Sequence, residues 1–283
     1  MPEGVEVNWM TDNINKHLVK KSKLCRLQDV EIVSGRYITH SLPKNYKDFR
    51  EVLIKNKLYI KLLKSKGKFV YLTFEEPDES SGDGMKNSDW SVWITLGLTG
   101  DLVLEDDKKD HTRAIFTTCD GKFYFDDSRN FGTLTFSNDP KELEKKLASL
   151  GPDILQDSGT PHLNPNKFVE IMRGINQNKL IAMALIDQKK ISGIGNYLRA
   201  DILYKAKVSP FKKLGDLSDI ELKRIYKASV DVVRQSFNTQ NNNGLHTYNF
   251  KVYMQNKDPK GNPVEGNKLP DGRTIWWSPK VQH

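Results

Sequence analysis

The sequence has only two cysteines, Cys25 and Cys119, among its 283 residues. Two cysteines are too few for a disulfide framework or for a zinc site built from cysteine ligands. No apolar run is long enough to span a bilayer. The N-terminus also lacks the basic stretch followed by an apolar stretch that marks a secreted chain. We therefore expect an intracellular protein without a membrane segment, in a compartment that keeps thiols reduced.

Acidic residues are scarce in the second half of the chain. Residues 1–150 carry 24 Lys/Arg and 24 Asp/Glu, whereas residues 151–283 carry 20 and 12, which accounts for the whole net charge of +8. A basic half beside a neutral half favours an anionic partner, and nucleic acid first. Charge alone leaves open a basic surface that only contacts solvent.

No internal repeat is visible, and the texture of the sequence changes along the chain. A helix is predicted over 3–20 and a helical connector over 139–151. Short strand-like runs separated by Gly, Asp, Asn and Ser predict an antiparallel sandwich or barrel over about 26–137. Examples of these runs are 58–63, 69–74, 90–96, 102–104, 113–118 and 122–125.

The stretch 75–89 has no apolar periodicity and is predicted to be an exposed loop. Four later segments, 165–175, 179–188, 195–206 and 216–237, have helical periodicity, and the polar run 238–244 is predicted to end the helical part. The last 39 residues look like a two-stranded appendage. The fold class is therefore α+β, with two domains.

The chain opens with MPEGVE, which places a proline directly after the initiator methionine. The simpler interpretation is that Pro2 begins a helix whose positive end Glu3 and Glu6 stabilise. Removal of Met1 would instead leave Pro2 with a terminal amine whose pKa is about 7.7–8.0. Such an amine beside a carboxylate is a candidate nucleophile for a carbonyl-like carbon. Six residues alone favour the simpler interpretation.

The most specific stretch is KLIAMALIDQKKISGIGNYLRADILYKAKVSP (179–210). It predicts a helix, a tight turn containing Gly193 and Gly195, and a second helix that begins at Asn196. Backbone N–H groups and a helix N-terminus in this arrangement suit the binding of a phosphate. The stretch resembles the helix–two-turn–helix of the formamidopyrimidine-DNA glycosylase/endonuclease VIII family, including its LIDQ…GIGN wording.

The resemblance extends to the N-terminus. Pro2, Glu3 and Gly4, followed by Glu6, match the start of the family, whose members expose a processed N-terminal proline. Val5 departs from the proline that is usual at this place, and we expect a small effect. The resemblance implies that Pro2 is the nucleophile and that Glu3 transfers a proton at the sugar ring oxygen. Glu6 is expected to orient this turn rather than to react.

The resemblance also assigns roles in the β-domain. Lys68, in SKGKFVYL, matches a lysine before a strand that serves catalysis by contacting a phosphate. Arg129 and Phe131, in DDSRNFGTL, match one of two loops that fill the space left by an extruded base. Leu98, in LGLTG, matches the other loop, where methionine is common. A core role for Leu98 and Phe131 remains open at this point.

The C-terminal tail departs from the family, which usually binds zinc there through four cysteines. The sequence of residues 262–282 still resembles the β-hairpin of the family's finger. However, Ser278 and Val281 stand at the positions of the last cysteine pair. His246 and His283 cannot form a four-ligand site. We therefore predict no metal and no cofactor, and the tail resembles the zincless finger of some endonuclease VIII-like proteins.

Arg273 stands at the predicted tip of this hairpin, in DGRTIWW. It matches the family arginine that binds the phosphate beside the lesion, and its alternative role is that of a solvated turn residue. Trp276 and Trp277 are expected to supply packing in place of a metal. With Lys68 and Asn196, the resemblance thus implies three phosphate-binding residues.

The resemblance covers the whole chain and implies its organisation. We expect an N-terminal helix and β-sandwich catalytic domain over 1–138, a connector over 139–160, a helix–two-turn–helix domain over 161–240 and a zincless finger over 241–283. The expected partner is damaged double-stranded DNA, bound by a monomer. The expected location is therefore a compartment that contains DNA: the nucleus, the cytoplasm or nucleoid, or a viral replication site.

The implied activity is that of a DNA glycosylase and AP lyase in base excision repair, which removes oxidised bases and cuts the strand by β,δ-elimination. Formamidopyrimidine-type members use a long loop to cover 8-oxoguanine, but the polar segment 238–249 is short, which favours oxidised pyrimidines and ring-opened purines. Two alternatives remain. One is a DNA-binding protein without chemistry, and the other is a tautomerase-like enzyme that uses the proline as a base.

Overall fold

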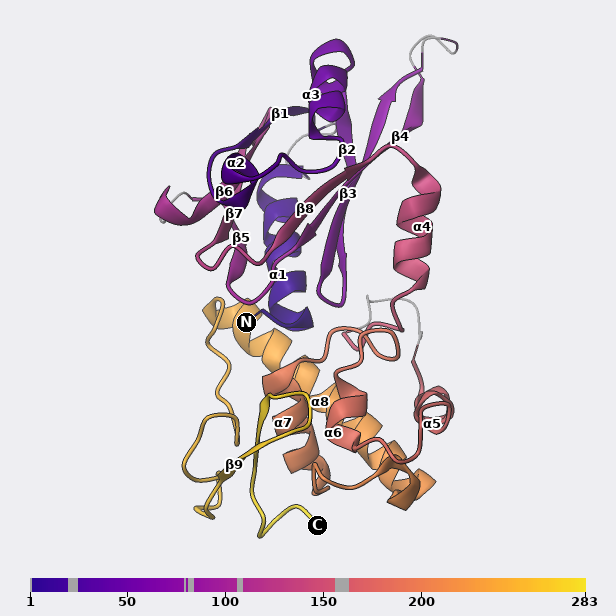
Figure 1. The fold of residues 1–283 in the computed structure, drawn as a ribbon, viewed down its shortest axis with the longest axis vertical. Helices are drawn as coiled ribbons and strands as arrows, with labels where there is room; N and C mark the ends of the chain where they lie inside the picture. Colours follow the sequence, from indigo (N-terminus) through magenta and orange to yellow (C-terminus); the bar gives the residue numbers. More distant parts are fainter. Residues whose placement is uncertain (1, 20–24, 79, 81–83, 106–108, 156–162) are drawn as a thin grey trace. The chain divides into compact units, whose positions relative to one another are not determined.

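The computed structural model describes residues 2–19, 25–78, 80, 84–105, 109–155 and 163–283 (Figure 1). Residue 20 of the predicted first helix, residues 79 and 81–83 of the predicted loop and residues 156–160 of the predicted connector lie outside this description. The chain divides into two units. The N-terminal unit holds Pro2 and Val7–Ala148, and the C-terminal unit holds Glu3–Glu6 and Ser149–His283.

The N-terminal unit is built on two four-stranded antiparallel sheets, as predicted (Figure 1). One sheet has the order β1-β6-β7-β5 and the other β2-β3-β4-β8. Their strands are β1 (Leu27–Ile32), β2 (Tyr59–Lys66), β3 (Phe69–Pro77), β4 (Met85–Thr95), β5 (Gly100–Val103), β6 (Thr112–Thr118), β7 (Gly121–Asp127) and β8 (Thr133–Ser137). Strands β1 and β8 fall in the stretch predicted to be rich in strands, outside the runs given as examples.

The helices of this unit begin with α1 (Gly4–Ile14), most of which belongs to it. Helix α1 continues as the π-helix η1 (Asn15–Val19) and thus confirms the predicted first helix as far as it is described. The others are α2 (Arg36–Thr39), α3 (Tyr46–Lys55), the 3₁₀ turn η2 (Lys109–His111) and α4 (Pro140–Ala148). Helix α4 confirms the helical connector.

Helix α3 was missed by the sequence analysis, although its apolar residues have helical spacing. Tyr46, Phe49 and Leu53 are its buried side chains. The Phe49 ring packs against Phe136 of β8 at 4.9 Å and against Phe74 of β3 at 5.7 Å between ring centroids. The helix therefore covers the β2-β3-β4-β8 sheet with three residues from a stretch that otherwise reads as polar.

The prediction of a loop over 75–89 was wrong in part, because β3 runs to Pro77 and β4 starts at Met85. Glu76 pairs with Lys86 across these strand ends, and their side chains lie 3.7 Å apart. The ribbon lacks apolar alternation because polar cross-strand pairs, rather than burial, hold its exposed end together.

The C-terminal unit is helical and ends in a hairpin. Its elements are α5 (Pro165–Arg173), α6 (Ile181–Leu185), α7 (Asn196–Ala206), the 3₁₀ turn η3 (Leu214–Asp216), α8 (Asp219–Asn243), β9 (Glu265–Lys268) and β10 (Thr274–Trp277). The pairing of β9 with β10 confirms the two-stranded appendage, and the whole confirms the α+β class. Helix α6 is shorter than predicted, because turns follow Leu185.

Helix α8 is longer than predicted and includes the polar run that was expected to end it. Gln240 is fully buried, and its side chain donates to Glu6 Oε1 at 2.6 Å. The helix ends only at Gly244, whose φ of 93° lies in the left-handed region. A buried polar anchor therefore keeps the run helical without apolar periodicity.

The segment 250–253 (FKVY) contains bends and a turn rather than a strand. Asp201 of α7 accepts the backbone N–H groups of Lys251 and Val252 at 2.9 and 3.0 Å. Burial raises the pKa of Asp201, which these hydrogen bonds oppose. The Asp201 carboxylate thus accepts the backbone hydrogen bonds that a neighbouring strand would accept in a sheet.

Candidate functional site

Glu3 lies at the N-terminus of α7. Its carboxylate accepts the backbone N–H groups of Gly195 and Tyr197, each at 2.8 Å, and that of Leu198 at 3.3 Å. Three donors at the positive end of a helix favour the ionised carboxylate. Nothing in the sequence pattern indicated that Glu3 and the GIGN turn are one structure.

Gly4 lies directly against the same turn. Its N–H donates to Gly193 O at 2.8 Å, and a Cβ atom on Gly4 would stand 2.6 Å from Gly193 Cα. Gly193 itself has a φ of 98°. Both glycines are therefore required because two backbone segments approach closely here. This approach explains why glycine occurs in both the PEG and the SGIGN motifs.

Glu6 is buried and holds Glu3 in place. One of its oxygens accepts the Glu3 N–H at 2.9 Å, and the other accepts Tyr197 Oη and Gln240 Nε2, each at 2.6 Å. Burial, and then the charge of Glu6, raise the pKa of Tyr197 well above its ordinary value, so the phenol stays a donor. These contacts of Glu6 fit the orienting role expected for it.

Asn196 and Arg273 are brought together by the start of β10. Asn196 Nδ2 donates to Thr274 O at 3.2 Å, and Thr274 follows Arg273 in the chain. Arg273 is exposed and its Nη1 lies 3.8 Å from Asp271 Oδ2. The first residue of α7 and the finger tip thus present an amide and a guanidinium in one region of the C-terminal unit.

Arg199 connects these two groups and was missed by the sequence analysis. It is fully buried, donates from Nη2 to Asn196 Oδ1 at 2.6 Å, and has Nη1 3.7 Å from Asp271 Oδ2. Burial lowers its pKa, and Asp271 opposes that shift. The available signal was an arginine one helical turn after Asn196, on the same face of the helix.

The finger is held by hydrogen bonds around Asp258. Buried Ser278, one of the two residues at cysteine positions, donates from Oγ to Asp258 Oδ2 at 3.0 Å. The Ser278 N–H donates to Gln282 Oε1 at 2.8 Å, and Asn262 also donates to Asp258. Burial acts to raise the pKa of Asp258, but the bonds from Asn262, Lys260 and Ser278 lower it overall.

In the N-terminal unit, Pro2 is buried and Lys68 lies in the turn between β2 and β3, directly before β3 as expected. Gly67, which precedes Lys68, has a φ of 58° that allows this tight turn. The Lys68 side chain is half-buried. It is therefore not a fully solvated surface lysine.

Leu98, Arg129 and Phe131 lie on two adjoining turns. Phe131 is 53% exposed, which excludes a core role for it, whereas Leu98 is half-buried. The exposed Arg129 guanidinium lies over the Phe131 ring at 4.8 Å from its centroid. An exposed apolar ring of this kind can insert between base steps, so the wedge role of Phe131 stays a prediction.

Asp127 holds the two turns together. Its Oδ1 accepts Thr99 Oγ1 at 2.6 Å, its Oδ2 accepts the Gly132 N–H at 2.6 Å, and the Arg129 N–H donates to Thr99 Oγ1 at 3.1 Å. Because Asp127 is buried, this arrangement fixes the spacing of the two turns.

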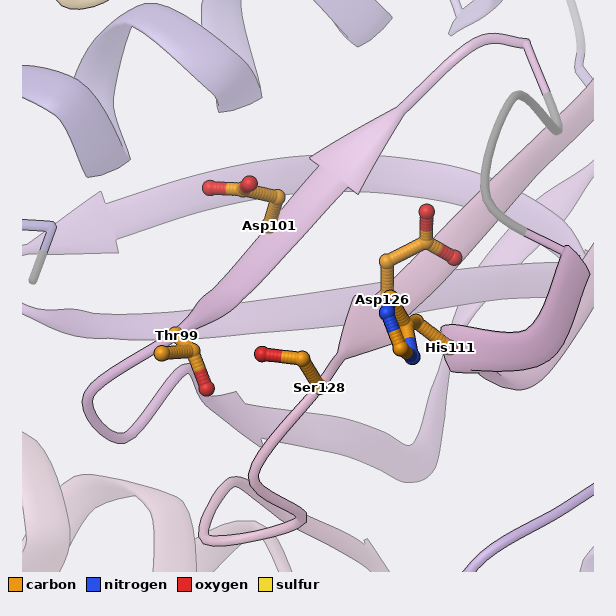
Figure 2. A pocket seen from close by; sticks show the side chains of 5 residues that line it. All are labelled: Thr99, Asp101, His111, Asp126 and Ser128. Atoms are coloured by element: carbon orange, nitrogen blue, oxygen red, sulfur yellow. The ribbon is translucent and has the colours of Figure 1, made fainter.

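A cavity of about 400 Å³ adjoins these turns and is lined by Thr99, Asp101, His111, Asp126 and Ser128 (Figure 2). Thr99 follows Leu98 and Ser128 precedes Arg129 in the chain. The two carboxylates make the cavity unsuitable for a phosphate. It therefore lies beside the turns that carry Leu98 and Arg129, and it is not a candidate phosphate site.

Only one group of described residues could supply three metal-ligand atoms close together, and it consists of Cys25, Cys119 and Asp120. It lies in the N-terminal unit, away from the finger sequence. Across the described ranges, no helix is both long and apolar enough to cross a membrane. The absence of zinc from the finger stays a prediction.

Comparison with known families covers nearly the whole chain. Residues 1–134 match the formamidopyrimidine-DNA glycosylase N-terminal domain, residues 150–247 the H2TH domain and residues 243–283 the C-terminal domain. A formamidopyrimidine-DNA glycosylase of Listeria monocytogenes is 31% identical over 207 residues, which cover 66% of this chain and 73% of that protein. One of Prochlorococcus marinus is 27% identical and aligns over 100% of both chains.

Solved structures show the same fold. The MutM (Fpg) protein of Thermus thermophilus has a TM-score of 0.76 at 22% identity, covering 99% of this chain and 98% of that one. The Lactococcus lactis enzyme, non-covalently bound to DNA containing an AP site, has a TM-score of 0.75 at 19% identity and covers 99% of each chain. This chain belongs to the formamidopyrimidine-DNA glycosylase family.

Proposed function

We propose that this chain is a bifunctional DNA glycosylase and AP lyase that removes oxidised bases through a Schiff base on Pro2. Family membership supports the glycosylase activity, and the bonding of Glu3 to the start of α7 carries the finer proposal. Glu3 follows the proposed nucleophile Pro2 in the chain, and its carboxylate accepts the N–H groups of the two residues that flank Asn196. A tautomerase would need neither this turn nor the basic second half.

The chemistry begins with extrusion of the damaged nucleotide, because C1′ is inaccessible within the duplex. After removal of Met1, the Pro2 nitrogen attacks C1′ and the bond to the base breaks. Glu3, whose carboxylate accepts three backbone N–H groups, is proposed to take the proton that the attacking nitrogen loses and to deliver it to the sugar ring oxygen. The ring opens and leaves an iminium between Pro2 and C1′.

Strand cleavage follows from the iminium, which acidifies the C2′ proton. Loss of that proton expels the 3′ phosphate, and a second elimination expels the 5′ phosphate, which leaves a one-nucleotide gap. Lys68, Asn196 and Arg273 are proposed to bind phosphates around the extruded nucleotide. Leu98, Arg129 and Phe131 are proposed to occupy the vacated space in the stack.

The proposed substrates are oxidised pyrimidines and ring-opened purines, in double-stranded DNA. Since α8 includes 238–243, only the short segment 244–249 follows it before FKVY, which supports the absence of a long cover for 8-oxoguanine. Single-turnover excision from matched duplexes tests this choice. Equal or faster removal of 8-oxoguanine would contradict it.

Borohydride trapping tests the nucleophile. The protein, with intact mass showing that Met1 is absent, is incubated with an abasic duplex and reduced. We expect a covalent adduct with the wild type and with Pro140→Ala, which removes a helix-starting proline of α4. Pro2→Ala should give none. If the wild type binds the duplex but forms no adduct, the protein only binds DNA and the proposal fails.

A further inference from the structure

The two cysteines of the chain lie side by side, although 93 residues separate them in the sequence. Cys25 precedes β1 and Cys119 follows β6, and these strands pair from Leu27 with Thr118 onward. The Cys119 N–H donates to Arg26 O at 3.0 Å, which continues the contact beyond the ladder. Strand pairing therefore fixes the relative position of the two thiols.

The sulfur atoms are close and differ in exposure. The Sγ atoms of Cys25 and Cys119 and a carboxylate oxygen of Asp120 all lie within 4.8 Å of one another. Cys25 is 1% exposed, whereas Cys119 is an exposed turn residue. Cys119 Sγ lies 3.7 Å from Asp120 Oδ2, which can accept its proton. An oxidant thus reaches Cys119 first.

A metal fits this cluster less well than a disulfide does. A structural zinc site takes four protein ligands, and the described residues offer three here. Burial raises the pKa of Cys25 to about 11, and both a metal and the attack on Cys119 require loss of that proton, so the number of ligands rather than the pKa favours the disulfide. A disulfide requires only the two sulfurs, at a separation of about 2.05 Å.

We propose that Cys25 and Cys119 form a peroxide-sensitive pair that closes to an intramolecular disulfide. Cys119 sulfur attacks one oxygen of hydrogen peroxide, the O–O bond breaks, and water leaves with the proton passed through Asp120. Cys25 sulfur then displaces the sulfenic oxygen of Cys119, and a second water leaves. Two thiols are oxidised to one disulfide while one peroxide is reduced to two waters, and a thiol reductant reverses the change.

The disulfide would join the segment around Cys25 to the end of β6. The Cys25 segment contacts strands of both sheets. The Ile60 N–H donates to Cys25 O at 2.8 Å and the Leu27 N–H donates to Leu58 O at 2.9 Å, which joins this segment to β2. Its pairing with β6 joins it to the other sheet. A disulfide closing so long a loop restricts the unfolded chain, so we expect the melting temperature to rise by about 5–10 °C.

Hydrogen peroxide treatment of the full chain tests the proposal. We expect the mass to fall by two hydrogen atoms, both thiols to be lost from the denatured protein, and a peptide map without reductant to show Cys25 joined to Cys119. Dithiothreitol should restore the thiols and the lower melting temperature. Duplex binding by the reduced protein should be unchanged in Cys119→Ser, since neither cysteine belongs to the proposed DNA-binding set.

Two variants separate the steps. Cys119→Ser, at an exposed turn, should keep its buried thiol under the same treatment and show no rise in melting temperature. Cys25→Ala should form sulfenic and then sulfinic acid at Cys119, without a crosslink. Three results would overturn the proposal: sulfinic acid at Cys119 of the wild type while Cys25 keeps its thiol, crosslinks only between molecules, or stoichiometric zinc that is lost in Cys119→Ser.

Discussion

At the scale of single residues, the candidate site depends on a buried charged side chain that contacts more exposed polar side chains. Arg199 has no exposed surface, yet it bonds Asn196 and faces Asp271, which in turn faces Arg273. Its Nε has no hydrogen-bond partner among the described residues. A buried cation in this position is costly unless its geometry serves another group. We therefore propose Arg199 as a positioning residue for Asn196 and Arg273.

Arg199→Lys tests this role, because lysine keeps the charge but lacks the planar fork that reaches both Asn196 and Asp271. We expect Kd for an abasic-site duplex to rise about tenfold, equivalent to about 1.4 kcal/mol. Fluorescence anisotropy measures Kd, and circular dichroism confirms that the variant is folded. Arg224→Lys, on the exposed side of α8, is the matched control. An unchanged Kd in a destabilised Arg199→Lys protein would show that Arg199 serves the fold alone.

At the scale of elements, helix ends carry much of the local stability. Ser218 and Glu221 form a capping box at the start of α8, in which each side chain accepts the other's backbone N–H. The Ser218 N–H, and then Lys212, lower the pKa of Glu221 to about 2 from an ordinary 4.5. Helix α8 supplies Gln240 to Glu6, so its start and its end both bear on the site.

The depressed pKa of Glu221 predicts a pH dependence. A carboxyl group whose pKa is lower in the folded state stabilises the fold above its unfolded pKa, and this is lost as the pH falls. We expect Glu221→Gln to cost about 1 kcal/mol at pH 7 and to lose less stability than the wild type between about pH 4.5 and 2. Urea titrations across this range measure it. Glu170→Gln, an exposed partner of Lys167, should behave as the wild type.

The finger offers a second prediction at this scale. Asp258, with Ser278, Asn262 and Gln282, holds the loop that precedes β9 and the turn that follows β10. Asp258→Ala leaves buried donors without an acceptor, so we expect a loss of about 1–3 kcal/mol. A chelator should leave the wild-type melting temperature unchanged, and elemental analysis should find no zinc. Glu265→Ala, an exposed carboxylate on β9, is the control; stoichiometric zinc would overturn our interpretation of the tail.

At the scale of the whole molecule, the excess positive charge lies in one half of the sequence. All of the net +8 belongs to residues 151–283, which also contain Asn196 and Arg273. The proposed DNA contact is therefore dominated by phosphates, and such binding weakens with salt because bound counterions are released. The slope of log K against log salt counts the phosphates that are neutralised.

The phosphate-binding role proposed for Arg273 predicts how Arg273→Ala changes this slope. The variant should weaken binding to damaged and undamaged duplexes to a similar extent and should reduce the salt slope by about 1. Binding titrations from low to physiological salt measure both quantities. Lys223→Ala, an exposed lysine of α8, should change the slope less. If Arg273→Ala leaves the slope unaltered, Arg273 is a solvated turn residue.

The sequence by itself determined the α+β class, the order of strand-rich and helical parts, and the turn around Gly193 and Gly195. These features depend on residues that are close together in the chain. Local apolar periodicity and the positions of the glycines therefore predict them. Strand ends at 75–89 and the last turns of α8 were misread because polar pairs and the buried Gln240 replace apolar periodicity there.

Only the tertiary structure decided which residues act together. It joined Glu3 to the amides of Gly195 and Tyr197, placed Arg199 behind Asn196, and put Cys25 beside Cys119. These contacts link positions from three to nearly two hundred residues apart. The sequence does not show whether a glutamate carboxylate caps a helix or faces solvent. The backbone donors at a helix end are defined only once the chain has folded.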